Sequence, residues 1–198
     1  MNTPQGAPAP RPSQPGRPVP PFVLPRQPSP RPRLNYFKAG FTCLVGLYGL
    51  VCALNPQTFR FLDWVDLVFH EAGHVVFGLF GDFIGILGGS LMQVLIPVIV
   101  TGYFILYLQR WSGMVTLFWV GQSLFNVSVY VKDARAQALP LLGGDDTIHD
   151  WNWILGRLHL LRWDHVIGNA VYLLGLVVIL ASVMGGIYCS REDEATGE

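Results

Sequence analysis

The chain has 198 residues, of which 51% are hydrophobic and only 13% are charged, and its formal net charge at pH 7 is zero. Soluble domains usually contain about 25% charged residues, so this composition is typical of a membrane protein, and we expect no nucleic-acid partner. The three cysteines, Cys43, Cys52 and Cys189, lie in or beside apolar runs without paired spacing. That pattern argues against a disulfide framework and against a cysteine-type zinc site.

The first segment, residues 1–35, is rich in proline and arginine and contains few apolar side chains. Such a segment cannot bury enough apolar surface to offset the chain entropy lost on ordering, so we expect a disordered tail. Proline-rich sequences also adopt extended conformations that recognition domains bind, which leaves a partner for this tail as a possibility.

Five apolar segments follow and predict an all-α, polytopic membrane domain over residues 36–190 with about five transmembrane helices. The expected spans are 37–54, 61–80, 83–108, 114–131 and 166–188. Glycines early in the third span favour close helix packing, and Pro97 predicts a kink in it. Residues 191–198 form a short acidic tail.

The loop 132–165 separates the last two spans, and its part 151–163 has the tryptophans, arginines and helical leucine spacing of an interfacial helix. Ten of the 13 basic residues lie in the tail through Lys38 and in this loop. The positive-inside rule therefore predicts a cytoplasmic N-terminus and loop, and a C-terminus on the opposite side of what we expect to be the plasma membrane.

The second span contains the sequence Val-Phe-His-Glu-Ala-Gly-His-Val-Val at residues 68–76. His70 and His74 are four residues apart, so both imidazoles lie on one face of a helix and are able to bind one metal ion. Glu71 is rotated by about 100° from His70, which suits a base that acts on an attacking water rather than a metal ligand. Ionisable residues inside a membrane span indicate a functional site.

A catalytic zinc ion (Zn2+) normally has three protein ligands, so a third residue is expected. Gln122, Asn126, Tyr130 and Asp133 share one helix face of the fourth span in an otherwise apolar background. Asp133 would supply the third ligand, and Asn126 and Gln122 would contact the substrate.

Other candidates for the third ligand lie in the following loop. They are Asp145, Asp146, His149 and Asp150. A turn at the preceding glycines would bring Asp145 or Asp146 toward the metal, and His149 would instead complete a three-histidine site. These alternatives stay open at this point.

Four further polar residues lie in the second and third spans. Asp63 and Asp66 open the second span and are interpreted as interfacial charges that interact favourably with the helix dipole. For Ser90 and Gln93, hydrogen bonding between helices is favoured over contact with a substrate.

At residues 70–74 the chain resembles the site-2-protease family of intramembrane zinc metalloproteases. In that family, His-Glu-x-x-His lies in one transmembrane helix, and a later helix carries Asn-x-x-Pro and Leu-Asp-Gly, whose aspartate is the third ligand. Asn126 and Asp133 have a similar spacing, without the prolines and the final glycine. The resemblance implies a zinc peptidase that cleaves a membrane-embedded or juxtamembrane protein substrate, with Glu71 as its base.

We therefore expect an intramembrane zinc metalloendopeptidase that works within the lipid bilayer, with its active site toward the cytoplasmic half. The alternative is a non-catalytic membrane protein, either a metal-binding scaffold or a degenerate protease. The two differ in whether an acidic or histidine group approaches His70 and His74.

Overall fold

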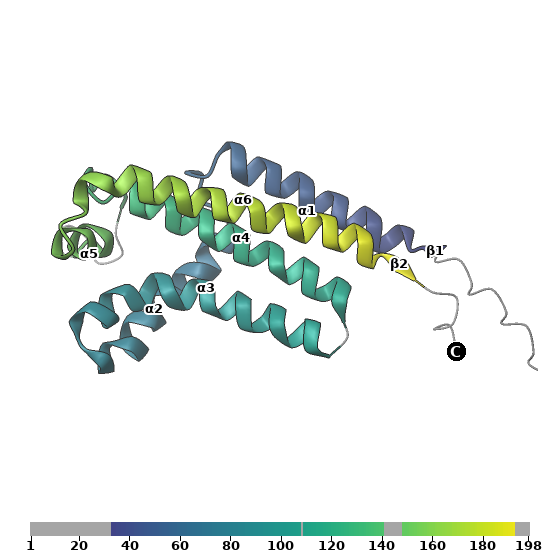
Figure 1. Ribbon diagram of the computed structural model, residues 1–198, viewed down its shortest axis with the longest axis horizontal. Coiled ribbons are helices and arrows are strands. Elements are labelled where there is room, and N and C mark those ends of the chain that lie inside the picture. Colours follow the sequence, from purple (N-terminus) through teal and green to yellow (C-terminus); the bar gives the residue numbers. More distant parts are fainter. Residues whose placement is uncertain (1–32, 108, 141–147, 193–198) are drawn as a thin grey trace, which may run out of the picture. The chain divides into compact units, whose positions relative to one another are not determined.

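The computed structural model of the protein describes residues 33–107, 109–140 and 148–192 (Figure 1). In chain order its elements are β1 (Arg33–Leu34), α1 (Tyr36–Leu54), α2 (Phe61–Phe77), η1 (Gly78–Phe80), α3 (Asp82–Leu106), α4 (Arg110–Lys132), α5 (Asp150–Arg157), η2 (Leu161–Trp163), α6 (Asp164–Cys189) and β2 (Arg191–Glu192). The predicted all-α class is confirmed. The expected tail up to residue 32, together with Asp145 and Asp146, lies outside the described residues.

Four of the five expected spans are long and apolar enough to cross a membrane: α1, α3, α4 and the segment Leu161–Cys189. The remaining expected span, 61–80, forms α2, which has only 17 residues before the 3-10 turn η1. It contains the carboxylates Asp63, Asp66 and Glu71. Length and charge therefore distinguish α2 from the other four helices. The chain is a multi-pass membrane protein in which this shorter helix packs against two of the candidate spans, α3 and α4.

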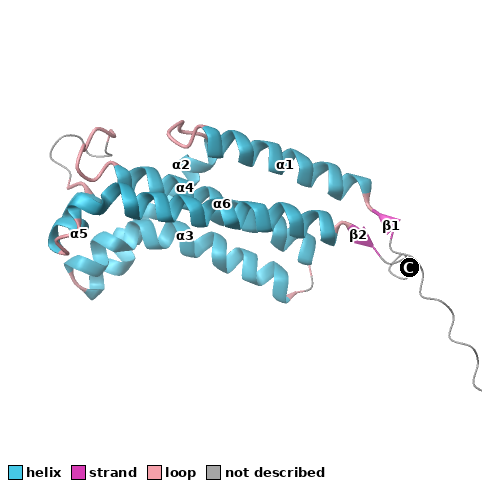
Figure 2. Cartoon of the chain, turned by 45° about the horizontal axis from the view of Figure 1, so that its top comes forward, coloured by secondary structure: helices cyan, strands magenta, loops and turns pink. Residues whose placement is uncertain are grey.

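The two ends of the helical region lie together. Strand β1 pairs antiparallel with β2, and the Asn35 N–H donates to Ser190 O at 2.8 Å. The start of α1 and the end of α6 therefore lie side by side (Figure 1, Figure 2). This arrangement differs from the predicted placement of the C-terminus opposite the N-terminus, which counted five crossings where four candidate spans are found among the described residues.

The described residues that directly follow α4 lie at the other end of the bundle (Figure 1). There the Arg135 Nε–H donates to Asp164 Oδ2 at 2.7 Å, which joins the end of α4 to the start of α6. Residues 33–38 and the described residues of loop 132–165 therefore lie at opposite ends of the bundle, whereas the prediction placed them on one side of the membrane. That prediction assumed a crossing by α2, which is not among the four helices long and apolar enough to span a membrane.

Helices α4 and α6 are antiparallel neighbours and form the most extensive helix pair (Figure 1, Figure 2). A Cβ on Gly121 would lie only 3.0 Å from Gly175 O, so the two backbones approach because both positions lack side chains. Buried Phe118 and Phe125 of α4 pack against Ile179 of α6. This pair is the support on which α1, α2 and α3 are placed.

Helices α2 and α3 pack closely through a second set of glycines. A Cβ on Gly73 would overlap Gly88 O, and a Cβ on Gly85 would lie 2.9 Å from the Cα of Gly78. The expected glycine-mediated packing is therefore present in α3. Helix α3 continues through Pro97 without interruption. This close approach brings the histidine face of α2 directly onto α3.

The connection from α1 to α2 is fixed by Arg60. Its guanidinium donates to Thr58 O at 2.7 Å and to Asn55 O at 2.8 Å, which satisfies carbonyls beyond the end of α1. Its backbone N–H donates to Asp63 Oδ2 at 2.6 Å, which caps the first turn of α2. These bonds hold the connecting residues 55–60 in place beside α2.

The expected interfacial helix over residues 151–163 is shorter than predicted. Helix α5 ends at Arg157, and His159 has a φ of 58° before the short turn η2 begins. A positive φ at a residue other than glycine interrupts a helix, so the leucine periodicity extended the prediction too far. The first residue of α5, Asp150, is the one that enters the site.

Candidate metal centre

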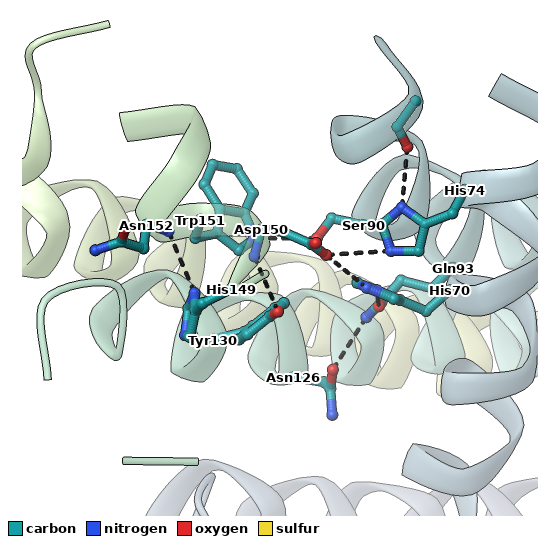
Figure 3. Close-up of polar contacts among 11 residues, drawn as sticks. His70, His74, Ser90, Gln93, Asn126, Tyr130, His149, Asp150, Trp151 and Asn152 are labelled. Atoms are coloured by element: carbon teal, nitrogen blue, oxygen red, sulfur yellow. Dashed lines mark hydrogen bonds and ion pairs between the residues drawn. The ribbon is translucent and has the colours of Figure 1, made fainter. Parts of the chain in front are cut away.

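Three side chains converge between α2 and the start of α5. The Nε2 atoms of His70 and His74 lie 2.9 Å and 3.2 Å from Oδ2 of Asp150 (Figure 3). The ligand atoms of these three residues lie within 4.8 Å of one another, and His70 and Asp150 are buried. The pairing of the two histidines was predicted from their spacing, and the structure adds a carboxylate that is 80 residues away from His70 in the chain.

Hydrogen bonds fix the tautomer of both imidazoles. His70 Nδ1–H donates to Gln93 Oε1 at 2.8 Å, and His74 Nδ1–H donates to Gly85 O at 2.9 Å. Each Nδ1 faces an oxygen that only accepts, so Nδ1 carries the proton and Nε2 presents its lone pair in the neutral ring. Two imidazole lone pairs and a carboxylate oxygen therefore point at one another, which is a donor set for a cation.

The spacing of these atoms fits a small divalent ion. Ligands of a tetrahedral ion with bonds near 2 Å are separated by about 3.3 Å. The observed separations from Asp150 Oδ2, 2.9 Å and 3.2 Å, are close to that value. Burial raises the pKa of Asp150, but its close contacts with the His70 and His74 imidazoles outweigh this effect and hold the pKa below its usual value. The carboxylate is thus in the ionised form that binds metals.

Gly89 of α3 forms the floor beneath the two histidines. A Cβ at this position would lie 2.6 Å from His70 Nε2 and 2.6 Å from His74 Nε2. Real Cβ atoms do not approach nitrogen so closely, so both rings occupy their positions only because residue 89 has no side chain. The glycines that bring α2 and α3 together also leave room for the site.

A chain of side-chain amides extends from His70 into the bundle. Gln93 Nε2–H donates to Asn126 Oδ1 at 3.1 Å, and Asn126 Nδ2–H donates to Asp63 Oδ1 at 3.1 Å. Gln122 Nε2–H donates to the same carboxylate oxygen at 2.7 Å. The amide N–H groups are all directed toward Asp63. The buried carboxylate therefore orients the amide of Asn126, which orients that of Gln93 and through it the His70 ring.

A cavity of about 530 Å³ lies directly beside the site and has His70 and Glu71 in its wall. Its remaining lining residues are Pro56, Gln57, Thr58, Phe59, Asp63, Trp64, Leu67, Gln93, Asn126, Val129, Tyr130, Leu139 and Pro140. Most of these are apolar or uncharged. Glu71 is exposed, whereas His70 beside it is buried, and both a carboxylate and an imidazole therefore face one cavity.

The side chain that lies beside His70 and His74 is not the one that was expected first as the third ligand. Asp133 accepts the His149 Nε2–H at 3.2 Å and the backbone N–H groups of Ala138 and Leu139, each at 3.0 Å. Neither Asp133 nor His149 belongs to the group around the two histidines. The prediction of Asp133, and the alternative of His149, are corrected to Asp150, which was one of the open loop alternatives.

The predicted substrate contacts have separate outcomes. Asn126 lines the cavity, so its contact with a substrate stays a prediction. Gln122 is 4% exposed and lies against Asp63, outside the residues that line the cavity. Gln93 bonds helices together, as interpreted, and Ser90 does the same by accepting the Trp151 Nε1–H at 3.0 Å. The role of Gln93 as the partner of His70 was missed.

Asp63 and Asp66 are not interfacial charges. Asp63 is 6% exposed and Asp66 is fully buried, where Trp119 Nε1–H and Ser123 Oγ–H donate to Asp66 Oδ1 at 2.7 Å and 2.8 Å. Both carboxylates therefore join α2 to α4. The two aspartates are three residues apart on α2, and their hydrogen-bond donors recur at similar intervals over residues 119–126 of α4. These matching polar stripes are a sequence pattern from which the pairing of the two helices was predictable.

No protein-family model, no curated protein and no solved structure matches this chain. The assignment of function consequently depends on the site itself.

Proposed function

We propose that this protein is an intramembrane zinc metallopeptidase that hydrolyses peptide bonds of membrane-embedded or juxtamembrane proteins. The observation that carries the proposal is a possible metal-binding group with a carboxylate in the cavity beside it. His70, His74 and Asp150 form a convergent donor set, and Glu71 lines the adjoining cavity. Three protein ligands with one open position are typical of catalytic rather than structural zinc.

The side chains have separate roles in this proposal. His70, His74 and Asp150 would hold zinc, which when bound supplies a Lewis acid that polarises the scissile carbonyl. Glu71 accepts a proton from the water that attacks this carbonyl and returns it to the departing amine as the C–N bond breaks. Gln93 and Gly85 O keep the two imidazoles in the tautomer that presents Nε2 to the metal.

The cavity supports an apolar peptide as the substrate. Phe59, Trp64, Leu67 and Val129 contribute apolar walls, while Asn126 contributes an amide beside Gln93. The peptide groups of a helix are already bonded and shielded, so a substrate helix has to unwind locally before the reaction. A membrane protein segment in extended form satisfies both requirements.

We further propose a cytoplasmic N-terminus in the plasma membrane. Eight of the 13 basic residues precede α1 or lie at the end of the bundle where α1 begins: Arg11, Arg17, Arg26, Arg31, Arg33, Lys38, Arg110 and Arg191. Of the others, Lys132 ends α4, and Arg135, Arg157 and Arg162 follow it. The positive-inside rule then favours the cytoplasm for the first group. The metal centre would lie toward the opposite face rather than in the cytoplasmic half.

The test compares the wild-type protein with Glu71→Gln, both purified full-length in detergent and loaded with Zn2+. Each is incubated with a library of apolar peptides, and the products are identified by mass spectrometry. Loss of a general base lowers turnover by about 10²–10⁴-fold, while zinc affinity should stay unchanged. Zinc binding without cleavage by either protein would contradict the peptidase proposal and support the non-catalytic metal-binding alternative.

A further inference from the structure

Asp133 bonds to the chain on both sides of residues 141–147. Its Oδ1 accepts the Ala138 N–H and its Oδ2 accepts the Leu139 N–H, both at 3.0 Å. The same Oδ2 accepts the His149 Nε2–H at 3.2 Å. One carboxylate at the end of α4 therefore fixes Leu139, which lines the cavity, and His149, which immediately precedes Asp150.

The tautomer of His149 follows from its position before α5. Its Nδ1 accepts the backbone N–H of Asn152 at 3.2 Å, which caps the first turn of the helix. A neutral imidazole that accepts at Nδ1 carries its proton on Nε2, so it donates to Asp133. The ring thus links the N-terminus of α5 to the end of α4, and its side chain is almost fully buried.

Tyr130 completes this contact from α4. Its ring lies 4.4 Å from the His149 ring, centroid to centroid, and its hydroxyl oxygen accepts the Asp150 N–H at 3.2 Å (Figure 3). Helix α5 has eight residues, and a helix of this length has little stability of its own in isolation. Contacts with the rest of the protein therefore set where Asp150 lies.

We propose that Asp133 is a positioning residue for the metal centre: through His149 it holds Asp150 at the distance from His70 and His74 that a metal ion requires. Asp133 touches neither the metal-binding group nor the cavity space. Its effect passes through one imidazole to the adjacent ligand. The proposal depends on the metal site within the proposed function, but it does not depend on peptidase activity.

The test measures the affinity for Zn2+ of the full-length protein by competition with a chelating dye. Asp133→Asn replaces a carboxylate that accepts three hydrogen bonds by an amide of the same shape. His149→Asn keeps a residue that caps helices well but removes the bond to Asp133. His159→Asn, at an exposed histidine after α5, is the matched control.

We expect Asp133→Asn and His149→Asn to weaken zinc affinity by about 10–100-fold each, as is typical of residues that orient metal ligands. Because both act through one contact, the double variant should be no weaker than the weaker single variant. His159→Asn should match the wild type. The thermal midpoint of the metal-free protein is measured for every variant, because a merely structural contact would lower that midpoint without changing the affinity of the folded protein.

Zinc affinity within twofold of the wild type in both variants would overturn the proposal, and so would a wild-type protein that binds no zinc. A wild-type protein that binds zinc but cleaves no peptide would contradict the peptidase proposal alone. The positioning role of Asp133 would then still be supported by the affinity difference.

Discussion

The substitution Gly89→Ala adds one methyl group to the centre of the site. The new Cβ would lie 2.6 Å from the Nε2 atoms of both His70 and His74. Ordinary contact requires about 3.5 Å, so both rings must move by about 0.9 Å, or α2 and α3 must separate. Metal sites tolerate deviations of about 0.2 Å in ligand distance. We therefore expect zinc affinity to fall by more than about 100-fold, beyond the usual effect of a residue outside the ligand set.

The stability of the fold should change much less than the affinity for zinc. Alanine in place of a helical glycine contributes up to about 1 kcal/mol of helix propensity, while overpacking costs about 1–3 kcal/mol. The net destabilisation is thus about 0–2 kcal/mol, and the variant should fold. This separation of binding from stability makes the substitution informative.

The matched control is Gly102→Ala in the same helix, where a Cβ meets no atom within 4 Å. The zinc affinity of each purified protein is measured by dye competition, and thermal unfolding is followed without metal. Gly102→Ala should bind zinc as the wild type does. If the Gly89→Ala variant folds and still binds zinc with wild-type affinity, the proposed geometry of the metal site is refuted.

Three further predictions concern the surroundings of the site, the packing of α2 on α3 and the membrane topology. Gln93→Leu removes the acceptor for the Nδ1–H of His70, so zinc affinity should fall by about 10–100-fold in dye competition; an unchanged affinity would mean that the amide chain has no influence on the metal. Gly73→Ala places a Cβ against the Gly88 carbonyl, and thermal unfolding in detergent should show a loss of about 3 kcal/mol, whereas wild-type stability would contradict the α2–α3 packing. Reporter fusions at the two chain ends should localise to the same side of the membrane, because β1 pairs with β2; opposite sides would restore a fifth crossing.

The sequence was sufficient for the local part of the site. His70 and His74 share a helix face by spacing alone, and Glu71 follows from the same helical geometry. The third ligand required a contact between residues 80 positions apart, and spacing carries no information about which loop carboxylate closes that distance. Asp133 was favoured because it continues a polar helix face, and that face does point inward, but toward Asp63 and His149 rather than toward the two histidines of the candidate site.

The number of crossings was less predictable than the helices themselves. Residues 61–80 are apolar enough to suggest a span, but Asp63 and Asp66 are buried against hydrogen-bond donors of α4 instead of lying at a membrane surface. A hydropathy profile contains no information about such hydrogen-bond partners on another helix. Because orientation depends on whether the number of crossings is odd or even, this single helix decides which side of the membrane is predicted for the C-terminus.

The most direct test of the account is the metal content of Asp150→Ala. Wild-type protein, Asp150→Ala and the exposed carboxylate control Asp82→Ala are purified full-length, equilibrated with limiting Zn2+ and analysed by elemental mass spectrometry. We expect about one zinc ion per chain for the wild type and for Asp82→Ala, bound by the one candidate metal-binding group found among the described residues, and almost none for Asp150→Ala. Full zinc occupancy in Asp150→Ala would contradict the assignment of Asp150 as the third ligand of His70 and His74.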